Sequence, residues 1–220
     1  SNVRPNASDP AQAGMWNIML PFGSNFLPVR TVVTMTSDTT LDLNNVNQQI
    51  ASLVDTDATG HQILLGFGTL TVGGVDNLTS SFSGAIHGGG GLTKVGTGTL
   101  TLSGANDYTG DTIVEDGTLS IVTDTPWLSD TGAVKITSGA IMDLAFSSEL
   151  PKDIVGEMWL NGVQMYGTFN SITQPDYFTG IGSLLAHGYG NYWAPGTSGG
   201  QGGTTERWSS AVEKWAMAPG

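Results

Sequence analysis

The sequence predicts an all-β fold, and three observations lead to this class. Short alternating runs of Leu, Ile, Val and Thr are separated by Gly, Asn and Asp at nearly regular intervals, as in strands joined by tight turns. Glycine contributes 32 of the 220 residues, whereas the helix formers Ala, Glu, Lys and Arg are sparse. No helix of ordinary length fits between the runs, so strands must form the core.

The clearest pattern runs from Gly88 to Val122. It predicts strands near Leu92–Val95, Thr99–Leu102, Thr112–Val114 and Thr118–Val122. Gly98, Gly104, Gly110 and Gly117 recur between or beside these strands, at the points where the chain must bend sharply. We therefore expect a ladder of strands in which the turns matter as much as the core.

Earlier runs repeat the pattern and predict strands at 31–35, 39–43, 49–54, 62–66 and 69–73. At a period of two, apolar residues point inward and Thr occupies the opposite face. The expected inward residues are Leu41, Leu43, Ile50, Leu53, Ile63, Leu65, Leu70 and Val72. A slip of one residue would expose all of them, so the alternation determines the pairing.

The last third of the chain is less regular. Met158–Val163 predicts a hairpin around Asn161 and Gly162. Residues 188–203 are rich in glycine, as flexible linkers are. Beyond them, apolar residues at helical spacing predict one short amphipathic helix. Its apolar face would consist of Trp208, Ala211, Val212 and Trp215.

The stretch GGLTKVGTGTLTLSGANDYTGDTIVEDGTL, from Gly90 to Leu119, resembles the autotransporter-associated β-strand repeat of secreted bacterial proteins. Flanking segments are similar to that family as well, so that the resemblance covers roughly Thr39 to Ala186. It implies a single parallel β-helix (β-solenoid) on an extracellular protein, without an active site common to the family. We then expect an N-terminal arm or cap at 1–30, the solenoid at 31–187 and a tail at 188–220.

Charge and composition exclude several classes of partner. Seven Lys and Arg stand against 19 Asp and Glu, a net charge of -12, so we expect no nucleic-acid partner. Without cysteine, the chain has neither disulfides nor thiolate metal sites. No apolar stretch reaches the roughly 20 residues that span a bilayer, so no membrane-spanning segment is expected. We expect an extracellular or cell-surface protein whose leader has been removed.

Some β-helices degrade polysaccharides, so a carboxylate site has to be considered. The candidate acids are Asp107, Asp111, Glu115 and Asp116, with Lys94 and Lys135 as the local cations. The repeat already accounts for these acids as turn residues, and no motif sets them around a substrate. We therefore predict that the chain is not an enzyme.

The sequence also predicts no metal site and no cofactor. His61, His87 and His187 share no ligand spacing and are expected at the surface or in loops. Asp55 and Asp57 lack the spaced oxygen ligands of a calcium loop and fit a turn. Gly88–Gly91 leads into a strand, not into the helix N-terminus that would bind a phosphate.

Large apolar residues gather toward both ends of the chain. The predicted interface residues are Trp16, Phe22, Phe26, Tyr192, Trp193, Trp208 and Trp215. We expect these arms to pack on neighbouring copies, so that the solenoid builds an extracellular filament, sheath or similar homopolymer. One alternative is a monomeric adhesin or passenger-type module that presents loops to cell-surface glycans. The other is a polysaccharide-acting enzyme.

Overall fold

The computed structural model describes residues 17–19, 25–36, 38–57, 60–74, 77–123, 128–146 and 153–186. All of them lie in Ser1–His187, the first of the two units into which the chain divides. Every regular element in these described residues is a strand, which confirms the all-β prediction. The predicted linker at 188–203 and the predicted helix lie outside them.

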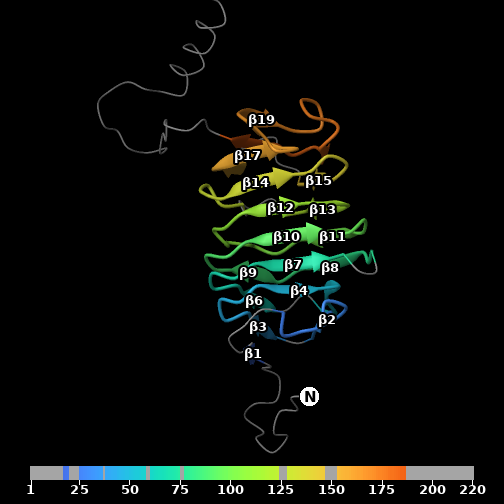
Figure 1. Cartoon of the computed structure of the whole chain (residues 1–220), viewed down its shortest axis with the longest axis vertical. Helices are drawn as coiled ribbons and strands as arrows, with labels where there is room; N and C mark the ends of the chain where they lie inside the picture. Colours follow the sequence, from blue (N-terminus) through green and yellow to red (C-terminus); the bar gives the residue numbers. More distant parts are fainter. Residues whose placement is uncertain are drawn as a thin grey trace, which may run out of the picture. The chain divides into compact units, whose positions relative to one another are not determined.

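The strands stack turn upon turn into a β-solenoid with three faces (Figure 1). One face is a four-stranded sheet of β1 (Asn17–Met19), β3 (Thr40–Asp42), β6 (Gln62–Leu64) and β9 (Ala85–His87). The second is a seven-stranded sheet of β4 (Gln48–Ile50), β7 (Leu70–Gly73), β10 (Leu92–Val95), β12 (Thr112–Val114), β14 (Ala133–Ile136), β17 (Glu157–Leu160) and β18 (Val163–Met165).

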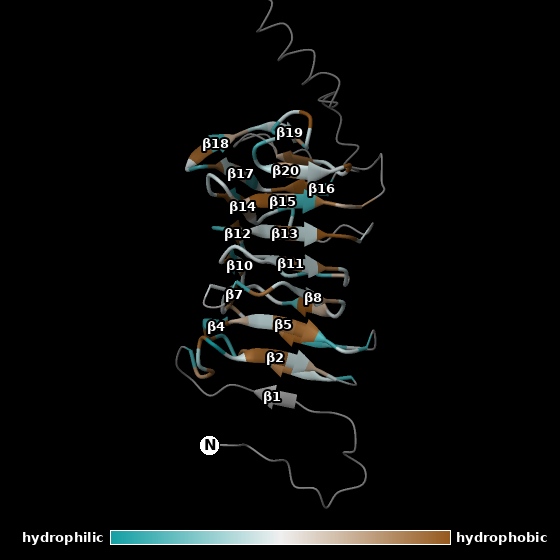
Figure 2. Ribbon diagram, turned by 90° about the vertical axis from the view of Figure 1, so that its right-hand side faces the viewer, coloured by the Kyte–Doolittle hydropathy of each residue, from teal (hydrophilic) through white to brown (hydrophobic). Residues whose placement is uncertain are grey.

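The third face is seen in Figure 2 as a column of strands. It begins with the pair β2 (Val32–Met35) and β5 (Ser52–Asp55), and β5 lies beside β8. The column continues as a five-stranded sheet of β8 (Ser80–Phe82), β11 (Thr99–Leu102), β13 (Thr118–Ile121), β15 (Ile141–Leu144) and β20 (Phe178–Gly180). A further sheet contains β16 (Asp153–Val155), β19 (Gly167–Phe169) and β21 (Leu184–Ala186).

Strands of successive turns pair in parallel and in register. Leu92 of β10, for example, is flanked by Leu70 of β7 and Thr112 of β12. All eight residues predicted to point inward are buried, with exposed fractions of 4% or less. The parallel solenoid and its register are therefore as the sequence predicts.

One corner of the solenoid is built from glycine. A Cβ on Gly90 would fall on the carbonyl oxygen of Gly68, one turn earlier. The same relation joins Gly110 to Gly90 and Gly132 to Gly110, and the Gly110 N–H donates to the Gly90 carbonyl at 3.0 Å. These glycines recur because adjacent turns approach too closely here for any side chain.

One strand prediction needs correction. The run at 49–54 is not one strand: it divides at Ala51 into β4 and β5, which belong to different sheets. Ile50, Ala51, Ser52 and Leu53 are all buried, because the chain turns a corner there and successive residues face the interior. In β12, which has the predicted bounds, Thr112 lies inside the core and Ile113 is partly exposed.

The predicted hairpin is confirmed. β17 and β18 pair antiparallel, with Leu160 opposite Val163. Asn161 and Gly162 have φ values of 49° and 78°, as a type I′ turn requires. β19 and β21 also pair antiparallel, whereas β20 and β21 pair in parallel with β15 and β16.

The first residues of the solenoid come from the segment predicted as an arm or cap. β1 pairs in parallel with β3 and so supplies hydrogen-bond partners to that strand. At the seven-stranded sheet, Leu27 and Gln48 exchange two hydrogen bonds of 2.9 Å between the Leu27 backbone and the Gln48 amide. These contacts hold Leu27 beside β4, and the arm or cap at 1–30 stays a prediction.

Tyr108 lies within the core and donates to or accepts from the Thr112 hydroxyl at 2.7 Å. Burial raises the pKa of Tyr108 above its usual 10.0; the Thr112 hydrogen bond opposes this rise and the charge of Asp153 adds to it. Above pH 10 the unfolded chain therefore loses a proton that the folded chain keeps, and stability falls as pH rises.

We expect the free energy of unfolding to fall between pH 10.5 and 12 with a slope of up to about 1.4 kcal/mol per pH unit from this residue. Denaturant titrations followed by far-ultraviolet circular dichroism measure the slope. Tyr108→Phe should remove this contribution while keeping the ring in the core. Equal slopes for the two proteins in this range would contradict the assignment.

Candidate functional site

The predicted carboxylates do not converge on a common site. Asp107 lies 2.6 Å from Nδ1 of His87, and Asp111 accepts a 2.6 Å hydrogen bond from Nζ of Lys135. Asp116 accepts from the Gly117 N–H at 2.8 Å, and Glu115 is exposed just after β12. The first two acids bind a partner on a neighbouring turn, so their contacts join turns to one another.

Lys94 does not face solvent, contrary to its assignment as a local cation beside the acids. It occupies an inward position of β10 between Val72 and Val114 and is 1% exposed. Its ammonium donates to the carbonyl oxygens of Val95 at 2.8 Å, Gly96 at 2.5 Å and Asp116 at 3.2 Å. The period of two from Leu92 was the sequence signal for this inward position.

The burial of Lys94 has an electrostatic consequence. Desolvation lowers its pKa below the usual 10.5, and the charge of Asp116 acts in the opposite direction. The three carbonyls come from two successive turns, so the side chain ties one turn to the next. Lys94 is thus positioned to stabilise a corner and not to contact a substrate.

His61 lies in the loop before β6, as predicted, but it is buried and does not lie at the surface. Its Nε2 lies 2.7 Å from Oδ1 of Asp57, and its Nδ1 lies 3.1 Å from Oγ1 of Thr39. Asp55 accepts hydrogen bonds of 2.6 Å from both the N–H and the hydroxyl of Ser83. His87 is partly exposed, and His187 lies outside the described residues.

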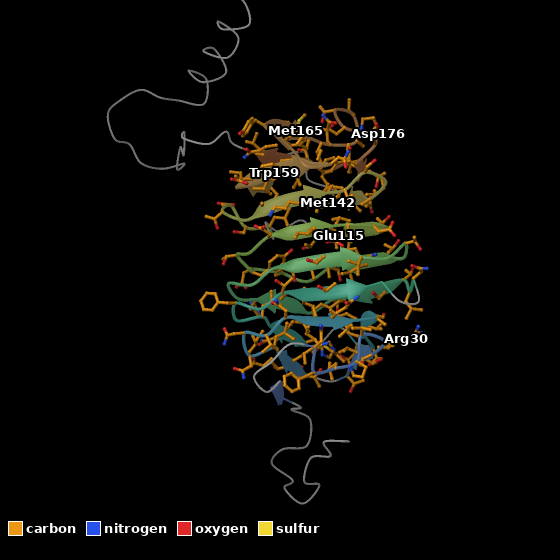
Figure 3. All side chains as sticks on the ribbon, in the orientation of Figure 1. Arg30, Glu115, Met142, Trp159, Met165 and Asp176 are labelled. Carbon is orange, nitrogen blue, oxygen red and sulfur yellow. The ribbon has the colours of Figure 1, made fainter. Side chains whose placement is uncertain are left out.

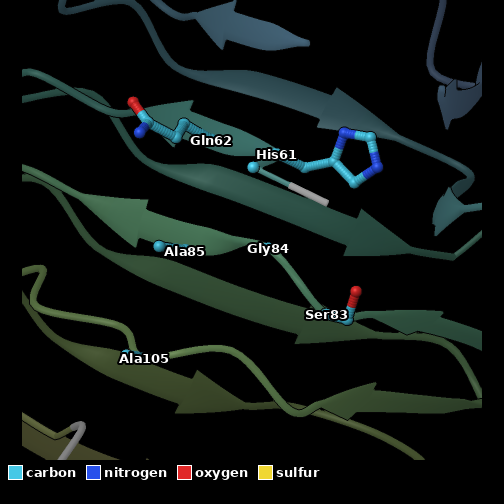
Figure 4. Close-up of a pocket in the computed structure, with 7 residues that line it drawn as sticks. His61, Gln62, Ser83, Gly84, Ala85 and Ala105 are labelled. Carbon is cyan, nitrogen blue, oxygen red and sulfur yellow. The ribbon is translucent and has the colours of Figure 1, made fainter. Parts of the chain in front are cut away.

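A shallow hollow of about 190 Å³ opens beside His61 (Figure 4). Small side chains on successive turns create it, and it is lined by Gly60, His61, Gln62, Ser83, Gly84, Ala85 and Ala105. Both ring nitrogens of His61 already have partners, and so does the Ser83 hydroxyl. Within the described ranges, no group of three or more His, Cys, Asp or Glu side chains could hold a metal ion.

A second polar group lies on the outer face of the seven-stranded sheet, which we call the Trp159 cluster: Asp111, Lys135, Glu157, Trp159 and Gln164. Trp159 is opposite Lys135 of β14 on one side and Gln164 of β18 on the other. Its indole N–H donates to Oε2 of Glu157 at 2.8 Å. Sequence analysis did not single out Trp159, although its place between inward Met158 and Leu160 indicates an outward ring.

Of the predicted interface residues, only Phe26 falls within the described residues, where it is 43% exposed. Trp16, Phe22, Tyr192, Trp193, Trp208 and Trp215 lie outside them. Sequence reasoning did not predict the exposed apolar residues near the last strands. These are Val163 at 59%, Tyr166 at 53%, Ile172 at 87% and Ile181 at 76%.

Residues 92–121 match the model of the Passenger-associated-transport-repeat family. The chain carries this repeat. The matched residues run from β10 to β13, the ladder on which the sequence resemblance rested, and the expected resemblance to an autotransporter-associated repeat is therefore confirmed. In the part of the chain that the structure describes, no helix has the length and apolarity to cross a membrane.

Over 190 residues the chain is 33% identical to the adhesin BmaC autotransporter of Brucella suis biovar 1 (strain 1330). The alignment covers 82% of this chain and 6% of the relative, so the chain spans a small part of the length of that protein. No solved structure matches the chain. Strands before and after residues 92–121 belong to the same stacked sheets.

Proposed function

We propose that the chain is a non-catalytic β-solenoid segment of an extracellular passenger that functions in adhesion. The passenger repeat and the autotransporter relative imply a secreted or cell-surface location. The relative is an adhesin by name, and this supports a binding role over a purely structural one. A solenoid suits such a role because its outward side chains form rows along flat sheets, available to a partner.

The arrangement of the charged groups supports the proposal that the chain is not catalytic. A polysaccharide-acting site needs an acid and a base converging on one bond. Here Asp107 and Asp111 are paired with cationic or ionisable partners on neighbouring turns, and Lys94 is turned into the core. Each of these candidate groups thus has a place in the stacking of turns.

Adhesion can be tested with beads that carry the purified full chain. We expect such beads to bind to cultured epithelial cells several-fold more often than albumin-coated beads do. Heat-unfolded chain on the same beads should lose the excess binding. Equal counts for chain and albumin would contradict the proposed function.

Self-assembly into a filament or sheath is a second candidate, favoured by the exposed apolar residues near the last strands and by Phe26. Burying such residues against another copy would remove apolar surface from water, and a contact that does not close on itself produces a filament. Light scattering and electron microscopy of the full chain test this: filaments are expected, and a stable monomer at high concentration would exclude them. Filaments that persist unchanged after deletion of residues 188–220 would exclude a role for the predicted tail.

A further inference from the structure

The side chains on the outer face of the seven-stranded sheet differ in size and chemistry from one end of the sheet to the other. One outward row passes through all its strands, from residue to paired residue. In order, the row is Gln49, Thr71, Thr93, Ile113, Lys135, Trp159 and Gln164. Short Thr side chains in the middle of the sheet thus give way to a flat aromatic ring between two long polar side chains. Figure 3 labels Trp159 at this end of the sheet.

A hydrogen bond to Glu157 orients the ring of Trp159. Glu157 and Trp159 lie two residues apart on β17 and so share the outer face, where the indole N–H donates to Oε2 of Glu157. Within the described residues this is the one side-chain hydrogen bond of Glu157, and it uses one of the two carboxylate oxygens. The other oxygen can accept from a ligand beside the ring.

The groups around the ring add further donors and acceptors. Nζ of Lys135 is directed to Asp111, on the side of β14 away from Trp159, so that its charge is balanced there. Gln164 lies directly across from Trp159 and makes no side-chain hydrogen bond to another described residue. An outward aromatic ring is thus bordered by a carboxylate and an amide.

We propose that the Trp159 cluster binds a neutral pyranose unit of a glycan. A pyranose ring has one face of C–H groups that can stack on an indole, and its rim carries hydroxyls that both donate and accept. The Glu157 carboxylate and the Gln164 amide are suited to hydroxyls at that rim. This inference rests on the proposed adhesive function and gives it a partner class.

Charge selects the kind of glycan. Asp111 and Glu157 outnumber Lys135 in the cluster, and the chain as a whole has a net charge of -12. A sulfated or carboxylated sugar would be repelled, whereas uncharged hydroxyls are compatible with the carboxylates. The cluster therefore fits neutral glycans and disfavours acidic ones.

Isothermal titration calorimetry of the full chain with four neutral tetrasaccharides, built from glucose, N-acetylglucosamine, mannose or galactose, tests the inference. A heparin-derived tetrasaccharide serves as the acidic comparison. We expect at least one neutral probe to bind and the acidic probe to bind at least 10-fold more weakly. Trp159→Ala should weaken the neutral probe at least 10-fold, and Trp159→Phe by less, because Phe keeps an aromatic face.

Phe67→Ala is the matched control, because Phe67 is an aromatic residue that is 84% exposed and lies outside the cluster. It should leave the affinity unchanged. Circular dichroism should show that Trp159→Ala remains folded, as expected for an outward residue. Absence of binding by every neutral probe, preference for the acidic probe, or equal affinity of Trp159→Ala and the unaltered chain would overturn the proposal.

The same variants separate this inference from the proposed function. Beads carrying Trp159→Ala that adhere to cells as well as the unaltered chain would refute the role of the cluster in adhesion and leave adhesion itself standing. An unaltered chain that binds a neutral probe but does not adhere on beads would refute adhesion and leave the glycan site standing.

Discussion

Leu100→Ala is expected to lower the free energy of unfolding by about 2–5 kcal/mol, the range for removing a buried Leu side chain and leaving a cavity. Leu100 is fully buried on β11, between Ser80 and Leu119 of the adjacent turns. A cavity there interrupts the stack on both sides, and neighbouring turns held by backbone hydrogen bonds cannot easily close it. Urea titrations followed by circular dichroism measure the change.

Thr101→Ala is the matched control, one residue further along the same strand. Thr101 points to the outer face and is partly exposed, so its replacement should change stability by less than about 1 kcal/mol. Similar losses for the two variants would show that the inward and outward faces of β11 are wrongly assigned.

Gly90→Ala is expected to destabilise the solenoid by about 3 kcal/mol or more, at or above the upper end of the usual cost of overpacking. The added methyl group would overlap the carbonyl oxygen of Gly68 and approach Cβ of Leu65. Gly90 also accepts a hydrogen bond from Gly110 and donates one to Gly66, so the clash cannot be relieved without disturbing three turns. Thermal and urea unfolding would measure the loss.

Gly89→Ala provides a close comparison. A Cβ on Gly89 would meet the ring of Phe67, which is 84% exposed and free to rotate away from it. We expect a change of less than about 1 kcal/mol. If Gly90→Ala were tolerated as well as Gly89→Ala, the close packing of the glycine corner would be wrong.

Much of the fold was predictable because the turns stack directly on one another. In such a stack, the alternation of residues along one strand already determines which of them lie in the core. β10, β11 and β12 begin and end at the predicted residues, and the eight predicted inward residues are buried. Each strand pairs with the strand one turn away, so the alternation of a single strand already states which residues face the core. The Asn161-Gly162 turn was predictable for a similar local reason.

Positions at corners and in polar contacts were harder to predict. Consecutive buried residues around Ala51 look like one strand until the bend of the chain is known. Lys94 is a charged residue at an inward position, and residue type alone argues for the surface. Its burial depends on three carbonyl oxygens, one of them from Asp116 on the next turn, which no local pattern brings to it.

The candidate site also combines features that the sequence predicts with features that depend on the tertiary structure. Sequence reasoning named Asp111 and Lys135 as an acid and a cation, but their 2.6 Å contact and the place of Lys135 beside Trp159 depend on the pairing of β12, β14 and β17. Trp159 by itself is one aromatic residue in a strand. It becomes the centre of a cluster because parallel pairing places side chains from distant turns in one row.

The sequence by itself determined the all-β class, the alternation of inward and outward residues, and the repeat that relates the chain to passenger proteins, because these properties are encoded in short-range periodicity. Only the tertiary structure decided which charged groups are buried, where the chain turns its corners, and which outward side chains share a face. Those outcomes depend on distances between residues that are 20 or more positions apart in the chain, such as Lys94 and Asp116. The alternation of residues within one strand does not specify such distances.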